Sequence, residues 1–200
     1  MGKIFCLMGK SSTGKDTIYK ALLDQNDFGL KKIIPYTTRP IREGERDGRE
    51  YHFCGEEQVR QFRQKNQIVE LRAYDTVYGI WKYFTVDDGQ IDLAADSYLL
   101  IGTLETYTKI RSFYGNDRVI PIYIEVEDGE RLFRALARER EQKEPRYAEL
   151  CRRFLADSAD FSEEKLKEGG ITTRFSNTSI EETVDRIIEF IEDDYEGKRD

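Results

Sequence analysis

Long apolar runs are missing from this sequence. No stretch approaches the roughly 18 consecutive apolar residues that a membrane-spanning helix needs. The apolar segment near the start ends at Gly9 and Lys10, which is too early for a secretory signal peptide. These absences predict a cytoplasmic protein that has no membrane partner.

Histidine and cysteine are scarce. The only histidine is His52, so a metal site built on several histidines is excluded, and a Ser-His-Asp or Cys-His nucleophile would have to use that residue. The three cysteines, Cys6, Cys54 and Cys151, lie far apart, have no metal-ligand spacing and are odd in number. We therefore expect reduced thiols and no disulfide framework.

Positive charge is in deficit, with a formal net charge of −7. A protein that binds nucleic acid is usually basic over its contact face, so this balance predicts no nucleic-acid partner. An anionic small-molecule substrate would need cations gathered locally. Because charge runs are most often solvated faces, clustering alone does not define a site. Four such clusters occur: Lys10 and Lys15; Arg39, Arg42, Arg46 and Arg49; Arg131, Arg134, Arg138 and Arg140; Arg152 and Arg153.

The clearest motif present is a phosphate-binding loop between an apolar segment, residues 4–8, and a helical pattern, residues 17–26. A Gly-x4-Gly-Lys sequence lets the backbone curl so that successive N–H groups point at phosphate oxygens, while its lysine reaches the β and γ phosphates. The loop predicts a bound triphosphate as a ligand of Gly9, Ser11, Ser12, Thr13, Gly14 and Lys15, and the resemblance described below implies that this ligand is ATP.

Asp16 occupies the position where such loops usually have a serine or threonine whose hydroxyl binds Mg²⁺. Its carboxylate could bind the metal directly or through water, because Mg²⁺ prefers oxygen ligands and keeps several waters. Alternatively, Asp16 only complements the positive end of the following helix dipole, and Thr17 helps to hold the metal. Both residues are therefore candidate metal ligands, and both readings stay open.

The order of expected elements predicts an α/β fold: a P-loop core with a doubly wound parallel sheet, an inserted small β-rich lobe that binds the acceptor, and a helical lid. The chain of 200 residues suits one domain, with a core at 1–35 and 97–200, a lobe at about 36–90 and a lid at about 134–160. We expect strands at 4–8, 32–36, 69–73, 78–84, 98–101, 118–126 and 171–175, and helices at 17–26, 56–65, 104–113, 128–141, 145–160 and 180–193.

Residues 36–53 read YTTRPIREGERDGREYHF, which closely resembles the acceptor-phosphate motif of the guanylate kinase family. The resemblance implies that Arg39, Arg42 and Tyr51 clamp the acceptor phosphate. This assignment is chemically sound, since two guanidinium forks can chelate a phosphate dianion and a tyrosine hydroxyl adds a neutral donor. Further matches imply that Tyr78 and Gly79 also contact the acceptor, and that Glu70 reads the guanine base.

The resemblance extends over nearly the whole chain and implies the reaction GMP + ATP to GDP + ADP, with Mg²⁺, by a monomer or homodimer. Arg134, Arg138 and Arg153 look like the lid arginines that reach the ATP phosphates, and Asn177 resembles an asparagine near the adenine. Within this scheme the catalytic residues are Lys15, Arg39, Arg138 and Arg153. Arg134 and Arg138 are four residues apart on an expected helix, so they would share a face, or would simply pair with neighbouring glutamates in solvent.

Three positions depart from the family pattern: Pro35 and Ile80 stand where serine or threonine is usual, and Gly102-Thr103 replaces the start of an acidic turn. Lys15-Asp16, Tyr78-Gly79-Ile80 and Gly102-Thr103 resemble the ribose 1,5-bisphosphate phosphokinases, whose acceptor is a sugar phosphate. The complete clamp and Glu70 favour a nucleotide. A third hypothesis is a non-catalytic binding module of guanylate kinase-like fold, against which the intact Gly9, Gly14 and Lys15 argue.

Overall fold

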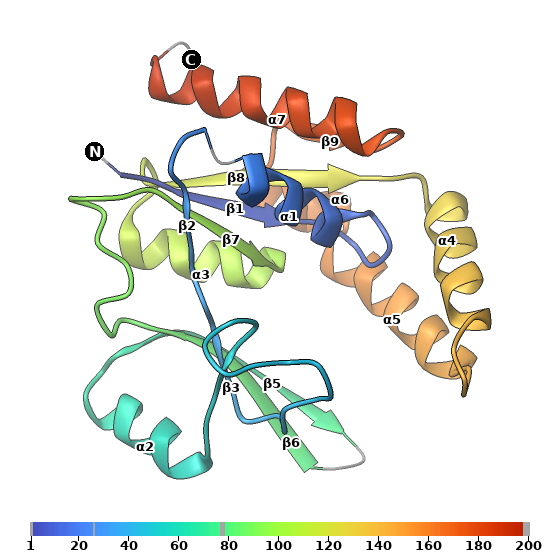
Figure 1. Cartoon of the computed structure of the whole chain (residues 1–200), viewed down its shortest axis with the longest axis horizontal. Helices are drawn as coiled ribbons and strands as arrows, with labels where there is room; N and C mark the ends of the chain where they lie inside the picture. The colour runs from blue at the N-terminus through green and yellow to red at the C-terminus, as the bar shows by residue number, and fades with distance from the viewer. Residues whose placement is uncertain (1, 26, 77–78, 198–200) are drawn as a thin grey trace.

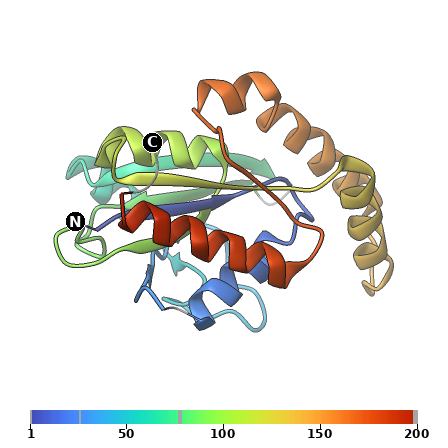
Figure 2. The ribbon, with the colours of Figure 1, turned by 90° about the horizontal axis from the view of Figure 1, so that it is seen from above.

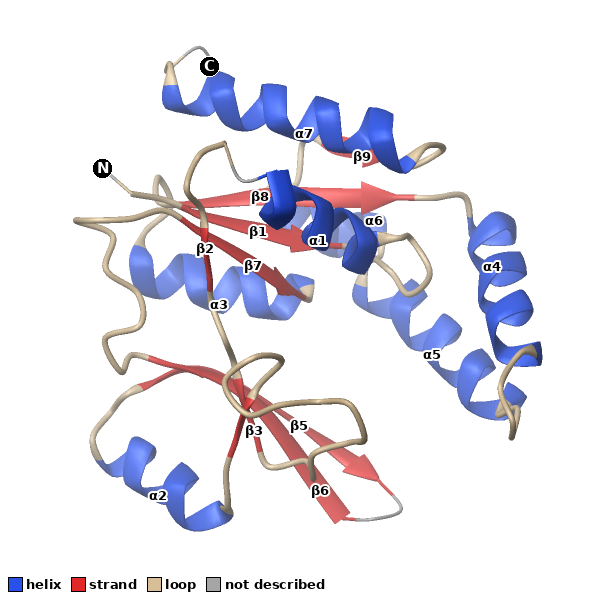
Figure 3. Ribbon diagram, viewed as in Figure 1, coloured by secondary structure: helices blue, strands red, loops and turns tan. Residues whose placement is uncertain are grey.

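Figure 1 shows the computed structural model, which describes residues 2–25, 27–76 and 79–197. Its centre is a five-stranded parallel sheet in the order β2-β7-β1-β8-β9. The strands are β1 (Ile4–Met8), β2 (Lys31–Lys32), β7 (Tyr98–Gly102), β8 (Val119–Glu125) and β9 (Arg174–Ser176). Figure 3 shows that β1, β7 and β8 all point toward the same end of the molecule, where the phosphate loop follows β1.

Helices cover both faces of this sheet, as the view in Figure 2 shows. Successive residues of β1 point to opposite faces. Phe5 and Leu7 pack with α1 (Lys15–Gln25) and α7 (Ile180–Tyr195), whereas Cys6 packs with α3 (Leu104–Tyr114) and α6 (Glu163–Glu168). All five residues of β1 are buried, which explains why this strand reads as an unbroken apolar run.

The inserted lobe has its own four-stranded sheet in the order β4-β3-β6-β5. It comprises β3 (Tyr36–Thr37), β4 (His52–Phe53), α2 (Glu56–Gln64), β5 (Ile68–Thr76) and β6 (Gly79–Val86). Val59 and Phe84 form a small core under α2. The lobe joins the main body where β5 meets α3, and there Lys109 Nζ donates a hydrogen bond to the Leu71 carbonyl at 3.3 Å.

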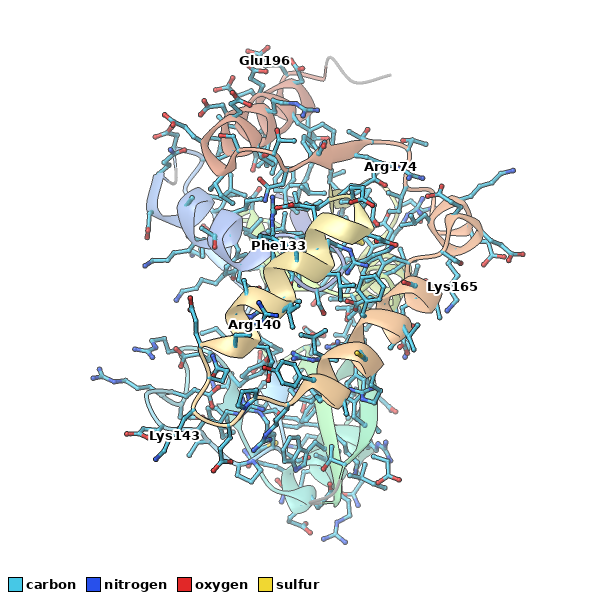
Figure 4. All side chains as sticks on the ribbon, turned by 90° about the vertical axis from the view of Figure 1, so that its right-hand side faces the viewer. Phe133, Arg140, Lys143, Lys165, Arg174 and Glu196 are labelled. Carbon is cyan, nitrogen blue, oxygen red and sulfur yellow. The ribbon has the colours of Figure 1, made fainter. Side chains whose placement is uncertain are left out.

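Two helices, α4 (Asp128–Arg140) and α5 (Tyr147–Asp160), form a hairpin beyond the carboxyl ends of the strands. Figure 4, which looks onto this end, shows α4 in front of α5, with Phe133 and Arg140 on α4. Phe133 is 69% exposed, so the outer face of α4 has little covering it. The hairpin is attached to the loop region mainly through Arg131, described below.

The expected architecture is confirmed, with local differences. The prediction of one strand at 32–36 is wrong, because β2 ends at Lys32 in the main sheet and β3 begins at Tyr36 in the lobe sheet. The last strand begins at Arg174 rather than at 171, and α6 was not expected. No helix of the described residues is both long and apolar enough to cross a membrane. The division into core, lobe and lid by residue number stays a prediction.

Candidate active site

The phosphate loop joins the buried end of β1 to α1 and requires both of its glycines. Gly14 has φ +84°, and a Cβ on Gly9 would lie 2.6 Å from the Ile124 carbonyl oxygen. Inside the loop, the Thr13 hydroxyl donates to the Lys10 carbonyl at 2.9 Å. Lys15 Nζ curls back to 3.5 Å from that carbonyl oxygen, which places the ammonium group over the loop. The loop therefore has the curled backbone and the lysine position that a phosphate-binding site needs.

Asn177, just after β9, forms a hydrogen bond to the backbone of the phosphate loop. Its Nδ2 donates to the Thr13 carbonyl at 2.7 Å, and its Oδ1 accepts from the Thr183 hydroxyl at 3.3 Å. The residue is only 3% exposed, so its amide is engaged with protein groups rather than with solvent. A direct role for Asn177 toward adenine stays a prediction.

We expect Asn177→Ala to destabilise the fold by about 1–3 kcal/mol, because it leaves the buried Thr13 carbonyl without its donor. The free energy of unfolding in urea measures this effect. Thr178→Ala, at the exposed neighbouring position, is the matched control and should change stability little. Equal stability of the two variants would show that the amide does not hold the loop.

Asp16 and Thr17 lie in the first turn of α1 and are both exposed. Their carboxylate and hydroxyl oxygens are hard donors of the kind Mg²⁺ takes, and it is commonly held by one or two protein oxygens plus substrate phosphates. The described residues contain no cluster of three or more side chains that could hold a metal alone. The donor set thus fits a metal bound jointly with a nucleotide. Which of the two residues contacts it stays open.

Two of the three lid arginines reach the loop region. Arg138 Nη2 lies 3.2 Å from the Ser12 hydroxyl oxygen, and Arg134 Nη2 lies 3.5 Å from the Asn177 carbonyl oxygen while its Nε pairs with Glu130 at 2.8 Å. Arg134 therefore pairs with a glutamate and also faces the loop, while the roles of Arg134 and Arg138 toward the ATP phosphates stay predictions. Arg153 is instead paired with Glu149 at 3.7 Å and is 45% exposed on α5, so its assignment to ATP stays a prediction.

The phosphate clamp is organised around Arg39, whose side chain is 3% exposed. Its Nη1 and Nη2 bond to the two carboxylate oxygens of Glu45 at 3.0 and 2.8 Å, and its guanidinium lies over the rings of Tyr51 and Phe53. The Glu45 carboxylate also accepts from the Arg42 backbone N–H at 2.8 Å. Glu45 thus ties the loop that carries Arg42 to the buried arginine, and the Arg42 side chain remains exposed beside it.

The Arg39 hydrogen bonds, opposed by partial burial, hold the pKa of the Glu45 carboxyl below its ordinary 4.5. Since the folded pKa is the lower one, the pair stabilises the fold above pH 4.5 and loses that contribution as pH falls through the folded value. We expect Glu45→Gln to melt at a lower temperature than the parent protein near neutral pH, with the difference closing in acid. Melting curves from pH 7 to 3 test this, with the exposed Glu43→Gln as control. A constant gap at every pH would contradict it.

Glu70 lies at the inner end of β5 with a fully buried side chain. One carboxylate oxygen accepts from the Thr85 hydroxyl at 3.1 Å and the other from Arg72 Nε at 3.1 Å. Gly79 begins β6 with φ +102°, a backbone conformation that favours glycine. Tyr78, the other expected contact of the acceptor, lies outside the described residues.

The chain matches the guanylate kinase family model over residues 1–194. It belongs to the guanylate kinase family. The guanylate kinase of Cupriavidus pinatubonensis is 42% identical over 69 residues, which are 34% of this chain and 32% of that protein. The Neisseria gonorrhoeae enzyme is 38% identical over 100 residues, 50% of this chain and 46% of the relative. These first matches thus span less than half of the relatives' length.

A longer match is to the guanylate kinase of Anaplasma phagocytophilum, 25% identical over 196 residues that cover 94% of this chain and 84% of the relative. A crystal structure of guanylate kinase from that organism superimposes with a TM-score of 0.66 at 22% identity, covering 96% of this chain and 85% of the other. At that identity the superposition shows the fold alone. It agrees with the parallel sheet and separate lobe sheet seen here.

Of the positions that depart from the family pattern, Pro35 precedes β3 and Ile80 lies on β6 of the lobe, whereas Gly102-Thr103 joins β7 to α3 in the main body. Ile80 is 60% exposed near the start of β6. The Pro35 carbonyl accepts from the His52 backbone N–H at 2.9 Å, and Thr103 caps α3 by accepting from the Thr106 backbone N–H at 3.2 Å. Pro35 and Ile80 carry no side-chain hydrogen-bonding groups, and Thr103 uses its hydroxyl locally, so the three departures offer a base little recognition.

Two residues that organise this guanylate kinase-type site were not among the expected site residues. Arg131 is 1% exposed, pairs with Asp128 at 2.7 Å, donates to the Ser11 carbonyl at 3.1 Å and stacks on Phe154. Asp157 of α5 accepts the Ser11 backbone N–H at 2.6 Å. These contacts connect both lid helices to the phosphate loop. The arginine cluster signalled Arg131, whereas no sequence pattern pointed to Asp157.

Proposed function

We propose that this protein transfers the γ-phosphoryl group of ATP to the phosphate of a nucleoside monophosphate, and that its acceptor is GMP. The observation that carries the proposal is the presence of two separate cationic phosphate sites on one chain. One is the loop with Lys15 and Arg138, and the other is the buried Arg39 with Arg42 and Tyr51. A protein that only hydrolysed ATP would have no use for the second site.

The second site suits a phosphate dianion. Arg39 is fixed by Glu45 and by two aromatic rings, so little conformational entropy is lost when it binds. The exposed Arg42 side chain can close over a bound phosphate, and the Tyr51 hydroxyl adds a donor. Because a second anion would compete with Glu45 for Arg39, we propose that the guanidinium shares its donors between the carboxylate and the acceptor phosphate.

Transfer needs no general base, since the attacking oxygen of the acceptor phosphate is already ionised. That agrees with the placement of the obvious candidates. His52 stacks on Tyr36 with ring centroids 4.7 Å apart, and burial raises the pKa of the Cys6 thiol to about 12. Lys15 and Arg138 are proposed to neutralise the charge that spreads over the transferring group. A bound Mg²⁺ would supply further charge neutralisation at the nucleotide phosphates.

The lobe and the lid are proposed to close over the two substrates and exclude water, which limits wasteful hydrolysis of ATP. The exposed side chains of α4, and the positions of Arg134 and Arg138 against the loop region, support this role for the hairpin. The two proposed substrates, ATP and GMP, are small molecules, so closure of the lobe and the lid around them is the expected motion.

The deciding experiment follows ADP release from Mg-ATP with GMP, dGMP, AMP, UMP and ribose 1,5-bisphosphate offered in turn. We expect turnover with GMP. Activity with ribose 1,5-bisphosphate alone would show that the acceptor is a sugar phosphate rather than a nucleotide. The exposed Ile80 and the capping Thr103 favour this second candidate. ADP release that does not depend on any acceptor would indicate an ATPase, and no turnover would leave a binding module.

A further inference from the structure

A second buried guanidinium lies in the acceptor lobe, on β5. Glu70, Arg72 and Tyr74 alternate along this strand, so their side chains share one face of the lobe sheet. On β6, Tyr83 is directly opposite Arg72, and Thr85 is opposite Glu70. The Arg72 side chain is 15% exposed and its Nε donates to Glu70 at 3.1 Å. The phosphate clamp does not use this ion pair.

Arg72 faces the same region as the clamp. Tyr83 pairs on its other side with Thr37 of β3, the strand that leads into Arg39, and its hydroxyl contributes to the raised pKa of the Arg39 guanidinium, against the opposing effect of burial. The Tyr51 and Tyr83 rings lie 5.6 Å apart. Tyr83 therefore lies between Arg72 of β5 and the end of β3, two residues before Arg39.

Arg72 also lies within electrostatic range of both the main sheet and the clamp. Burial raises the pKa of the Tyr51 hydroxyl and of the Cys6 thiol, and in both cases the positive charge of Arg72 acts against the rise. Cys6 belongs to the central strand β1 and Tyr51 to the clamp. An acceptor held by Arg39 would therefore be exposed to the charge of Arg72.

The charges of Glu70 and Arg72 favour a neutral ligand group beside them over a second anion. Glu70 is fully buried and its carboxylate already accepts from Thr85 and Arg72. A second phosphate at this place would meet the Glu70 carboxylate as well as the guanidinium, and like charges at close range disfavour binding. A flat, neutral group with donors beside an acceptor would satisfy both charged side chains. A guanidinium has five N–H donors, and the Glu70 bond uses one of them.

We propose that Arg72 determines which base the acceptor site takes, by donating from its Nη groups to the carbonyl oxygen of a 6-oxopurine whose N1–H faces Glu70. The inference rests on the proposed function, since it requires a nucleotide in the clamp. Arginine donating to the guanine O6 edge is a common specific contact of this base, and adenine offers an amino group there instead. Arg72 would therefore admit guanine and hypoxanthine and reject adenine.

The test measures binding rather than turnover. Dissociation constants for GMP, IMP, AMP and ribose 1,5-bisphosphate are determined by calorimetry for the parent protein, Arg72→Met and Arg72→Lys. Arg72→Lys keeps a positive charge beside the buried Glu70, so it protects the fold if the methionine variant fails to express. Arg60→Met is the matched control, because Arg60 forms an exposed pair with Glu57 on α2 of the same lobe.

We expect the parent protein to bind GMP and IMP at least about 10-fold more tightly than AMP, and both Arg72 variants to lose about 10-fold for GMP and IMP while AMP changes little. Arg60→Met should keep the parent preference. A purely structural Arg72 that only orients Glu70 would weaken GMP more than IMP, since only GMP offers a 2-amino group to the carboxylate, and that pattern overturns the proposal.

Other outcomes also decide the question. An unchanged GMP-to-AMP preference in Arg72→Lys, equal binding of AMP by the parent protein, no nucleotide binding, or tighter binding of ribose 1,5-bisphosphate than of GMP would each overturn it. Failure of the proposed function is distinguishable, because a parent protein that binds GMP with the expected preference but releases no ADP loses the kinase assignment and keeps the role of Arg72.

Discussion

Replacing Arg39 by alanine is expected to lower kcat/KM for the acceptor about 10²- to 10³-fold, with a raised acceptor KM and slower transfer, because one preorganised cation at the transferring group is lost. The KM for ATP should change little, since the loop and Arg138 are untouched. Steady-state kinetics with GMP varied at saturating ATP measure the effect. Removing Arg39 also leaves the Glu45 carboxylate without its guanidinium partner, and the rings of Tyr51 and Phe53 without the cation that lies over them.

The matched control for this experiment is Arg46→Ala. Arg46 belongs to the same loop and is exposed, and its described hydrogen bonds are made by its backbone: the N–H donates to Glu50 at 2.9 Å and the carbonyl accepts from the Arg49 N–H at 3.1 Å. It should keep nearly full activity. Comparable losses in both variants would mean that the loop responds to its total charge, and the clamp assignment would then be wrong. Circular dichroism and melting curves establish that Arg39→Ala is folded.

Lys15→Met is expected to reduce transfer about 10³-fold or more at saturating substrates, because the ammonium group over the loop would no longer offset charge on the transferring phosphoryl group. Methionine keeps an unbranched side chain of similar length, so the loop should keep its conformation. The rate of ADP formation and the affinity for ATP are measured together, and both should suffer while GMP binding persists.

Lys20→Met serves as the control, since Lys20 is an exposed lysine further along the same helix. Its activity should equal that of the parent protein. A tenfold change in rate corresponds to about 1.4 kcal/mol of activation free energy. If Lys15→Met instead retained more than about a tenth of the parent rate, the loop lysine would lower the activation free energy by less than this amount. The site would then operate differently from the one proposed.

The elements that the sequence predicted well are those in which burial and periodicity agree. The apolar run of β1 was placed to the residue, and α2, α3, α4 and α7 to within two residues, because each has a continuous apolar stretch or stripe and clear ends. The strand expected at 32–36 failed for a tertiary reason. Residues 33–35 carry the chain from one sheet to the other, and apolar composition does not say which sheet a residue joins.

The candidate site also contains some residues that the sequence predicts and others whose role only the tertiary structure reveals. The phosphate loop is predicted from spacing, because a glycine-rich curl is a local chemical requirement, whereas the roles of Arg39, Arg42 and Tyr51 are implied by the resemblance to guanylate kinases and stay predictions. The partners that fix them are not local. Glu45 belongs to the arginine-rich motif itself. In contrast, the Ser11 backbone N–H donates to Asp157, which is 146 residues away in sequence. The pairing of Arg72 with Glu70 depends on a buried sheet face. Sequence reasoning has no access to such contacts without a fold.

The phosphate loop is translated before the residues that hold its conformation. Its curl depends on the Ile124 carbonyl that excludes a side chain at Gly9, on Asp157, and on Asn177, which bonds Thr13 across 164 residues. A growing chain therefore carries a full Gly-x4-Gly-Lys segment long before anything holds its shape, and contacts this distant in sequence form slowly. Nucleotide affinity would then arise only after the segment that contains Ile124, Asp157 and Asn177 has folded against the loop, so that chains not yet extended to Asn177 would not sequester ATP.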